Sequence, residues 1–236
     1  MTTDMLYVKD HIAEDFQTAE AIKTIRTNLF FCGASVKTVA LTSVSPDEGK
    51  SSLSFQLAAS IAQTGKKVLY LDADLRKSVM MNRLGLHTKV QGLSHYLSGL
   101  AKLDDILYKT DVPKLYLMFA GARIVNPTEL LGSAEFEKLF VSLKDNLDYV
   151  IVDTPPLGRV IDTAVIAPKV DGVIMVIDST RNSWRMEQKI KEQLEKAGAR
   201  ILGVILNKVD IRERSGYYGK YGYGYGYGYG NEKDRE

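Results

Sequence analysis

The chain is poor in the residues that build disulfide frameworks and metal cages. Its 236 residues include one cysteine, Cys32, and three widely spread histidines. A single thiol cannot form an internal disulfide, and it excludes a site that needs several cysteine ligands. The sequence therefore fits a reducing compartment, and we expect a cytoplasmic protein.

Long apolar runs and a strong charge of one sign are also missing. No stretch approaches the roughly 18 apolar residues that a membrane span needs. The first thirty residues contain five acids in place of the basic and then apolar start of a secretion signal. The formal net charge of +2 is too small to indicate a polyanionic partner, so we expect no nucleic-acid binding. Recruitment to the inner face of a membrane should then depend on a partner.

Short apolar runs alternate with helical patterns over most of the chain. The runs are rich in β-branched residues and cover 36–44, 66–74, 114–121, 147–156, 171–180 and 201–210. Helical periodicity covers residues 52–65, 133–146 and 184–198. This order predicts a single α/β domain over residues 38–210, with a doubly wound, mostly parallel sheet.

Two segments flank the predicted domain. Within residues 1–37, the stretch 16–31 repeats apolar residues every three to four positions, which predicts a helical arm. Residues 211–236 contain seven of the thirteen tyrosines, mostly alternating with glycine. This tail has no branched apolar residues beyond Ile211 and cannot build a core, so we expect it to be disordered.

A phosphate-binding loop is indicated where the first strand run meets the first helical pattern. Residues 43–52 read SVSPDEGKSS, in which Gly49, Lys50 and Ser51 form the second half of G-x-x-x-x-G-K-[ST]. Val44 stands in the place of the first glycine, and an ordinary serine-capped helix start is the alternative. Loop N–H groups would hold phosphate oxygens, the lysine would reach the β- and γ-phosphates, and the Ser51 hydroxyl would bind Mg²⁺. The predicted nucleotide contacts are Asp47, Glu48, Gly49, Lys50, Ser51 and Ser52.

Three acids follow predicted strands, where ligands of parallel sheets bind. Asp72 and Asp74 end the second run, and Asp153 ends the fourth. Each of these acids alone is better explained as a helix cap or a residue of a solvated turn. Three acids that converge beside one phosphate loop, however, indicate a catalytic or metal-binding site. Asp153 suits the role of holding Mg²⁺, and Asp72 could orient or deprotonate an attacking group as well as bind the metal. For Arg76, a structural partnership with these acids is favoured over phosphate binding.

The sixth strand run ends in a pattern that suggests a base-binding site. Asn207, Lys208 and Asp210 match the N-K-x-D by which many GTPases hold guanine. Four-residue patterns also arise by chance, and Asp210 could begin the linker to the tail. Taken alone the pattern favours GTP, with Asn207 at a strand end where a base should lie; the expectation of ATP comes from the resemblance that follows.

Together these segments resemble the bacterial tyrosine kinases of capsule and exopolysaccharide clusters. The resemblance covers nearly the whole chain and rests on SVSPDEGKSS, VLYLDADLRKS, VIVDTPP, NPTELL and the tyrosine-rich end. The first three correspond to the family's Walker A, A′ and B motifs, and its Walker A also lacks the first glycine. The resemblance implies ATP and Mg²⁺ as cofactors and catalytic roles for Lys50, Asp72, Asp74 and Asp153.

The resemblance also implies an assembly and partners. Glu20, Lys23 and Arg26 fall on an E-x-x-R-x-x-R motif that joins subunits of a ring, although by itself this pattern indicates only a solvated helix face. Lys23 replaces an arginine and loses its bidentate fork, so a weaker ring is expected. A membrane-spanning activator of the chain-length-regulator type and a protein tyrosine phosphatase are the implied partners.

The tail suits the role of the kinase's own substrate. A phenol with a pKa near 10 benefits from a positioned proton acceptor, and glycine keeps each phenol accessible. The nineteen residues from Asp210 to Tyr229 span about 24 Å as a coil and about 65 Å when extended, enough for the chain's own site or a neighbour's. An adhesive segment and a nucleic-acid-binding tail are the alternatives. The predicted acceptors are Tyr217, Tyr218, Tyr221, Tyr223, Tyr225, Tyr227 and Tyr229.

Two other whole-protein hypotheses share parts of this pattern. A partitioning or cell-division ATPase would have the same sheet, but its signature lysine would stand at the position of Ser45. A metal-insertion GTPase would need histidine or cysteine ligands that this sequence does not cluster.

Overall fold

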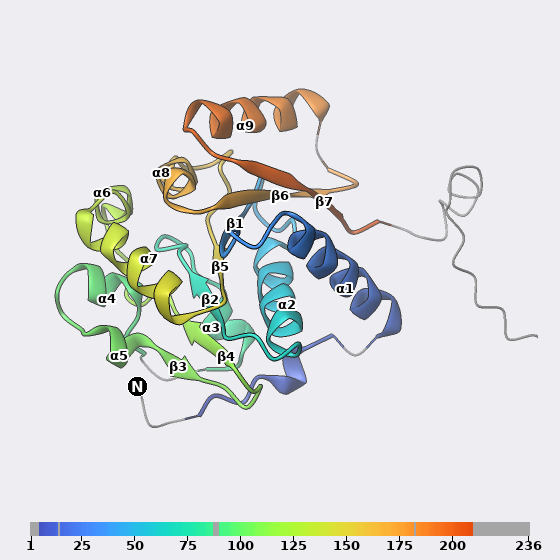
Figure 1. Cartoon of the computed structure of the whole chain (residues 1–236). Coiled ribbons are helices and arrows are strands. Elements are labelled where there is room, and N and C mark those ends of the chain that lie inside the picture. The colour runs from blue at the N-terminus through green and yellow to red at the C-terminus, as the bar shows by residue number, and fades with distance from the viewer. Residues whose placement is uncertain (1–4, 14, 87–89, 182, 210–236) are drawn as a thin grey trace, which may run out of the picture.

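The computed structural model describes residues 5–13, 15–86, 90–181 and 183–209 (Figure 1). The predicted tail, its seven tyrosines and Asp210 lie outside these residues. The strands are β1 (Thr38–Ser43), β2 (Val68–Asp72), β3 (Tyr108–Lys109), β4 (Leu115–Met118), β5 (Tyr149–Asp153), β6 (Gly172–Asp178) and β7 (Ile201–Asn207). The helices are α1 (Phe16–Phe31), α2 (Lys50–Ala62), α3 (Met80–Arg83), α4 (Leu93–Leu97), α5 (Leu103–Ile106), α6 (Pro127–Leu131), α7 (Ala134–Asn146), α8 (Asp162–Ile166) and α9 (Trp184–Lys196), with 3₁₀ turns at Lys9–His11 and Ala167–Lys169.

The strands form one sheet in the order β3-β4-β2-β5-β1-β6-β7. Every pairing is parallel except that of the short edge strand β3 with β4. All six predicted runs are strands, so the expected doubly wound α/β fold is confirmed. In the sheet, β5, β2, β4 and β3 lie on one side of β1, and β6 and β7 lie on the other. This change of direction places a topological switch point next to the loop that follows β1.

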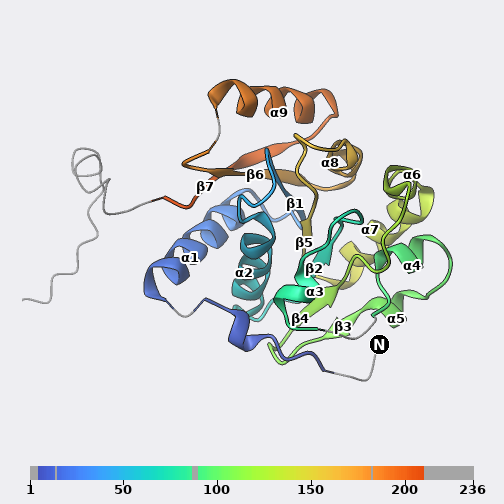
Figure 2. The same cartoon turned by 180° about the vertical axis from the view of Figure 1, so that it is seen from behind.

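Helices cover both faces of the sheet (Figures 1 and 2). One hydrophobic core lies under α1, α2 and α3 and includes Leu29, Phe55 and Met80. The other lies under α4 to α9 and includes Phe136 and Leu194. Five of the six predicted strands, β1, β2, β4, β5 and β6, are largely buried on both faces and read as continuous apolar runs, whereas the edge strand β7 exposes Val204 and Leu206.

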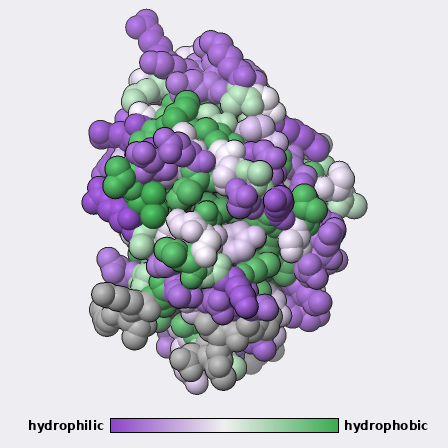
Figure 3. Space-filling model, turned by 90° about the vertical axis from the view of Figure 1, so that its left-hand side faces the viewer, coloured by the Kyte–Doolittle hydropathy of each residue, from purple (hydrophilic) through white to green (hydrophobic). Residues whose placement is uncertain are grey.

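The outer surface of the second helical layer is mixed. Seen from the side of α4, α6 and α7, apolar side chains alternate with charged ones (Figure 3). Val141 of α7 and Val125, just ahead of α6, are among the exposed apolar residues. Within the described residues, every helix is too short or too polar to cross a membrane.

The predicted arm is a helix with the expected bounds, and it packs against α2. Asp15 caps α1 by accepting a hydrogen bond from Thr18 N at 2.8 Å. Ile22 and Leu29 are buried, as the periodicity predicts, but Phe16 is 79% exposed and takes no part in the buried face. The apolar pattern of residues 16–31 thus predicts the burial of Ile22 and Leu29 but fails for Phe16, the first residue of the helix.

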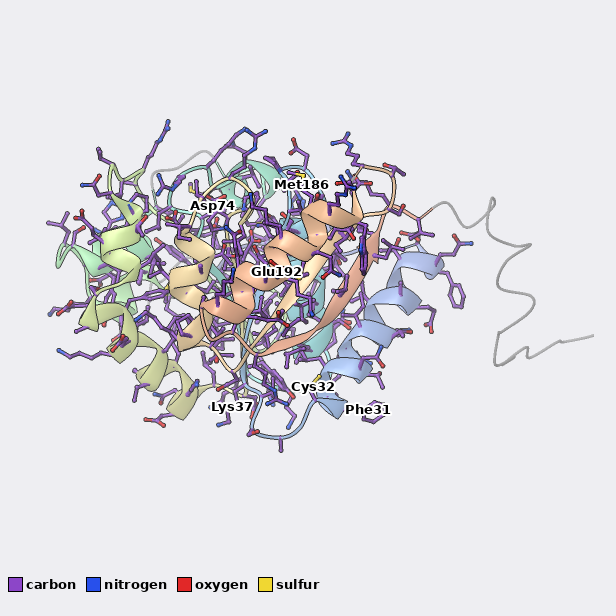
Figure 4. All side chains as sticks on the ribbon, turned by 90° about the horizontal axis from the view of Figure 1, so that it is seen from above. Phe31, Cys32, Lys37, Asp74, Met186 and Glu192 are labelled. Atoms are coloured by element: carbon purple, nitrogen blue, oxygen red, sulfur yellow. The ribbon has the colours of Figure 1, made fainter. Side chains whose placement is uncertain are left out.

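The carboxyl edge of the sheet gathers the loops that carry the predicted site. Seen from above, Asp74 after β2 lies at the carboxyl ends of the strands and Lys37 ahead of β1 lies at their opposite, amino ends (Figure 4). Asp72 of β2 pairs in register with Asp153 of β5, and Leu41 of β1 pairs with Asp153 on the other side. The topology thus brings acids that are 81 positions apart to neighbouring strand ends.

Candidate nucleotide and phosphoryl-transfer site

The loop between β1 and α2 opens the helix without a side-chain cap. Gly49 is the N-cap residue, with φ of +86°, and within the described part of the chain the helix has no side-chain cap hydrogen bond. The serine-capped alternative is therefore excluded. The free N–H groups of the first helical turn and the positive end of the helix dipole remain available to an anion, as a phosphate loop requires.

Close packing also explains the glycine. A Cβ on Gly49 would lie 2.2 Å from Nδ2 of Asn207, which itself donates a hydrogen bond to the Glu48 carbonyl at 2.8 Å. At the place of the first motif glycine, Val44 is buried and its backbone φ is not positive. This loop therefore has no conformational need for a glycine at that position.

Glu48 has a structural role in the loop. Its carboxylate is buried and accepts hydrogen bonds from the backbone N–H groups of Val44 and Ser45, both at 3.1 Å. Its side chain is thus turned toward the loop backbone, and a contact with nucleotide from this residue would come from its own N–H. Asp47 beside it holds a positive φ of 63°.

The centre of the site is a buried cluster around Asp153. Oδ1 of Asp153 is paired with Nζ of Lys50, and Oδ2 accepts a hydrogen bond from the hydroxyl of Tyr70 at 3.0 Å. Nζ of Lys50 also lies 3.2 Å from Oγ of Ser51. Asp72 is the in-register neighbour of Asp153 and accepts from Ser78 Oγ at 2.5 Å.

Burial gives Asp72 unusual acid–base properties. Loss of solvation, together with the neighbouring negative charge of Asp153, raises the pKa of Asp72 from 3.8 to about 7. Burial beside the same carboxylates also raises the pKa of Tyr70 well above 10. Asp72 is thus able to accept a proton near neutral pH.

The donor atoms fit Mg²⁺. Asp72 and Asp153 present two buried carboxylates side by side, and the Ser51 hydroxyl approaches the same lysine ammonium that Asp153 holds. A hydroxyl and carboxylates are oxygen ligands of the kind that this cation prefers. A cation here would also relieve the repulsion between the two acids. These three residues are the metal ligands that the sequence predicts.

Asp74 and Arg76 lie on the rim of the site. Oδ1 of Asp74 accepts hydrogen bonds from the backbone N–H groups of Arg76 at 3.2 Å and Lys77 at 2.9 Å, so this carboxylate stabilises a turn. Arg76 binds buried Asp162 through two hydrogen bonds of 2.6 and 2.9 Å, and it also donates to Thr128 Oγ1 at 3.1 Å. Arg76 therefore has a structural partner, but its side chain binds Asp162 and not the acids after β2 and β5 that the sequence suggested.

Two buried partners in this region were missed by sequence reasoning. Asp162 opens the short helix α8 and is fully buried, and Tyr70 sits inside an apolar strand. No local pattern marks either residue, because each finds its partner only across the fold. Thr128 lies within NPTELL, so this segment contributes a hydrogen bond to the Arg76 cluster.

Asn207 and Lys208 hold the phosphate loop from the opposite side. Lys208 Nζ donates to the Asp47 carbonyl at 2.6 Å and to Asp178 Oδ2 at 2.8 Å. That lysine contact, with the hydrogen bonds from Thr180, lowers the pKa of buried Asp178. The two residues therefore shape the loop from the β6–β7 side, where the sequence predicted the base.

A cleft of about 430 Å³ opens beside the loop. It is lined by Ser43, Pro46, Asp47, Glu48, Gly49, Lys50, Ser51, Asp74, Arg76, Lys77, Val79, Arg83, Pro155, Pro156, Arg159 and Val160. Ser52, a predicted nucleotide contact, is exposed near this cleft, and its hydroxyl accepts from the Arg83 guanidinium.

The predicted assembly residues lie on α1, which contributes no residue to the lining of the cleft. Glu20 and Lys23 form an exposed ion pair of 2.7 Å. Arg26 is half-buried and donates to the carbonyl and hydroxyl oxygens of Ser60 on α2, at 2.9 and 3.1 Å. Arg26 is therefore engaged within its own chain, whereas the other two side chains face solvent.

Comparison with known proteins finds close relatives of this arrangement. A family model described as an AAA domain matches residues 36–205. Tyrosine-protein kinase CpsD of Streptococcus agalactiae is 43% identical over 220 residues, which cover 93% of this chain and 95% of the relative. The kinase domain of Escherichia coli tyrosine kinase ETK superposes with a TM-score of 0.78 at 34% identity, over 89% of this chain and 80% of that one. The septum site-determining protein MinD of Pyrococcus horikoshii, complexed with Mg-ADP, is more distant, with a TM-score of 0.62 at 26% identity over 72% and 70% of the two chains.

Proposed function

This chain belongs to the family of bacterial tyrosine-protein kinases, and on that premise we propose that it phosphorylates the tyrosines of its own C-terminal segment, using ATP and Mg²⁺. The observation that carries the proposal is the buried cluster of Lys50, Asp153 and Asp72 beside an uncapped phosphate loop. It supplies a cation for phosphate oxygens, oxygen ligands for a metal and a proton acceptor for a phenol.

The proposed reaction is a direct phosphoryl transfer. The acceptor tyrosine oxygen forms a bond to the γ-phosphorus while the bond from that phosphorus to the β,γ-bridging oxygen breaks, which leaves ADP. The phenolic proton passes to Asp72, the buried carboxylate beside Asp153 at the neighbouring strand end. Bound Mg²⁺ would supply positive charge to the β- and γ-phosphate oxygens.

Lys50 has to change partners during this reaction. In the structure its ammonium is paired with Asp153. When a nucleotide enters, we infer that Lys50 turns to the β- and γ-phosphates and that Asp153 becomes available to the metal. Tyr70 keeps the other carboxylate oxygen of Asp153 in place throughout this exchange.

The acceptors and partners follow from the sequence. The seven tyrosines between residues 217 and 229 are the proposed substrates, presented to a neighbouring subunit or to the chain's own site. Each phosphate adds about 1.5 to 2 negative charges, so phosphorylated tails repel one another. We propose that full phosphorylation loosens a ring of subunits and that a phosphatase restores the ring.

Glu20, Lys23 and Arg26 are the proposed ring contacts. A membrane-spanning activator would recruit the kinase for capsule or exopolysaccharide synthesis.

The alternative of a positioning ATPase is not favoured. Its representative, MinD, is the more distant match, and Ser45 stands where that class has its signature lysine. The tyrosine-rich segment also has no role in that reading.

Intact-mass spectrometry after incubation with Mg²⁺ and ATP tests the proposal. Wild type should gain several phosphoryl groups, whereas Lys50→Met and a chain ending at Asp210 should gain none. Lys66→Met, which removes an exposed lysine distant in sequence from the loop, is the matched control and should behave as wild type. Each protein is measured with and without an activator's cytoplasmic segment. Nucleotide hydrolysis without any gain of mass in the activated wild type would overturn the kinase proposal.

A further inference from the structure

The sheet order gives the phosphate loop two different sides. On one side lie β6 and β7, whose residues Asn207 and Lys208 donate hydrogen bonds to loop carbonyls. On the other side lie β5 and β2, which end in Asp153 and Asp72. Because the metal ligands and the proton acceptor belong to the second side, the terminal phosphate and the incoming tyrosine should meet there.

The acceptor side of the cleft carries three exposed cations, which we call the acceptor-side cations. They are Lys77, which follows the Asp74 turn, Arg83 of α3, and Arg159, which follows the Pro155–Pro156 turn after β5. Among the described residues, the side chains of Lys77 and Arg159 make no ion pair or hydrogen bond, and that of Arg83 contacts only the Ser52 hydroxyl. These charges are not neutralised by the protein.

The other cations of the cleft are already committed. Lys50 is paired with Asp153, and Arg76 is bound to Asp162. Of the acids in the lining, Glu48 accepts from the loop backbone and Asp74 accepts from the turn that carries Lys77. The remaining acid, Asp47, has its carbonyl bound to Lys208, on the β6–β7 side.

A neutral phenol does not require three positive charges, but a phosphotyrosine does benefit from them. Its phosphate carries about 1.5 to 2 negative charges and three strong acceptor oxygens, which arginine and lysine recognise. From Tyr221 to Tyr229, tyrosine and glycine alternate strictly. Neighbouring tyrosines in an extended chain are thus about 7 Å apart along the backbone. A phosphorylated tyrosine can therefore bind the acceptor-side cations while the next, unmodified tyrosine reaches the γ-phosphate of ATP.

We propose that Lys77, Arg83 and Arg159 form a subsite for phosphotyrosine, so that each phosphorylated tyrosine primes the phosphorylation of the next one along the Tyr-Gly repeat. This inference rests on the proposed kinase function and names the substrate that the same cleft prefers: a peptide that already carries phosphotyrosine two residues from the acceptor. It makes modification of the repeat a cooperative process rather than a set of independent events.

Binding and kinetics of two peptides test the subsite. Both have the sequence of residues 220–230, and one carries phosphotyrosine at the position of Tyr225. The protein is the full chain with its seven tail tyrosines replaced by phenylalanine, which prevents competition from its own tail. Fluorescence anisotropy with Mg²⁺ and ADP should give a Kd for the primed peptide on the order of tenfold lower than for the unprimed one. With ATP, the primed peptide should show a correspondingly lower KM.

Variants identify the cations responsible. In Lys77→Ala and Arg159→Ala, the ratio of the Kd of the unprimed peptide to that of the primed peptide should fall toward one. Lys66→Ala, which changes an exposed lysine outside the cleft lining, should retain the ratio of the parent protein. Equal Kd values for the two peptides on the parent protein would overturn the subsite. It would also be overturned if Arg159→Ala weakened binding of ADP as strongly as binding of the primed peptide, because the cations would then serve the nucleotide.

The two proposals fail in different ways. If no peptide is phosphorylated but the primed peptide still binds more tightly, the kinase function is refuted and the phosphotyrosine subsite stands. If both peptides are phosphorylated with the same KM and Kd, the kinase function stands and the priming inference is refuted.

Discussion

Replacement of Asp72 by asparagine is expected to stabilise the folded protein above neutral pH. The carboxylate is 1% exposed and lies beside Asp153, and these two causes raise its pKa to about 7. Asparagine has nearly the same shape and can keep both hydrogen bonds, accepting from the Asp74 N–H and pairing with the Ser78 hydroxyl. It resembles the protonated acid, which the buried site prefers.

The magnitude follows from the two pKa values of Asp72. In the unfolded chain its pKa is near 3.8, and in the folded protein it is about 7. Between these values the folded protein keeps a proton that the unfolded chain has released, so stability falls as pH rises from about 4 to about 7 and is level above. A difference of about 3 pH units at about 1.4 kcal/mol each gives an upper limit of about 4 kcal/mol. Asp72→Asn should therefore gain up to about 4 kcal/mol at pH 8 and about 1 kcal/mol or less at pH 4.5.

Urea denaturation of the two proteins at pH 4.5 and 8, in EDTA to remove divalent cations, measures this difference. Asp74→Asn is the matched control, because Asp74 is half-buried and serves a surface turn, and it should show no comparable gain at pH 8. If the difference in free energy of unfolding between wild type and Asp72→Asn were the same at pH 4.5 and pH 8, burial of the Asp72 charge would not be the cause. Loss of autophosphorylation in the stabilised variant would show that the site gives up stability for function.

Three further substitutions test other contacts of the site. Tyr70→Phe removes the 3.0 Å hydrogen bond to Asp153 and should lower the free energy of unfolding by about 1.5 to 3 kcal/mol, and an unchanged urea midpoint would contradict the role of this hydroxyl. Arg76→Lys loses the two-bond contact to buried Asp162 and should cost about 1 to 3 kcal/mol in the same assay, with Lys77→Arg as an exposed control. Gly158→Ala places a Cβ 2.2 Å from a carbonyl oxygen of the phosphate loop; it should cost about 1 to 3 kcal/mol and weaken binding of a fluorescent ADP, and wild-type affinity would argue against this contact.

Much of the fold was open to prediction because its signals are local. Parallel strands read as apolar runs, including the partly exposed edge strand β7, and helices of 13 residues or more show their periodicity. The strands β1, β2 and β4 to β7 were therefore all anticipated, along with α1, α2, α7 and α9. The helices α3 to α6 and α8 have four or five residues, and β3 has two. Such elements are too short to establish a period, so their formation depends on the packing around them.

The amino-acid sequence already specifies which chemical groups reach the site: the loop residues around Lys50, the acids Asp72 and Asp153 at strand ends, and the row of tyrosines. How these groups pair depends on the folded chain. The bond between Lys50 and Asp153 joins residues 103 positions apart, and the contact of Tyr70 with Asp153 joins residues 83 apart. Burial and distance across the sheet set such pairings and the pKa of Asp72, and neither quantity exists until the chain has folded.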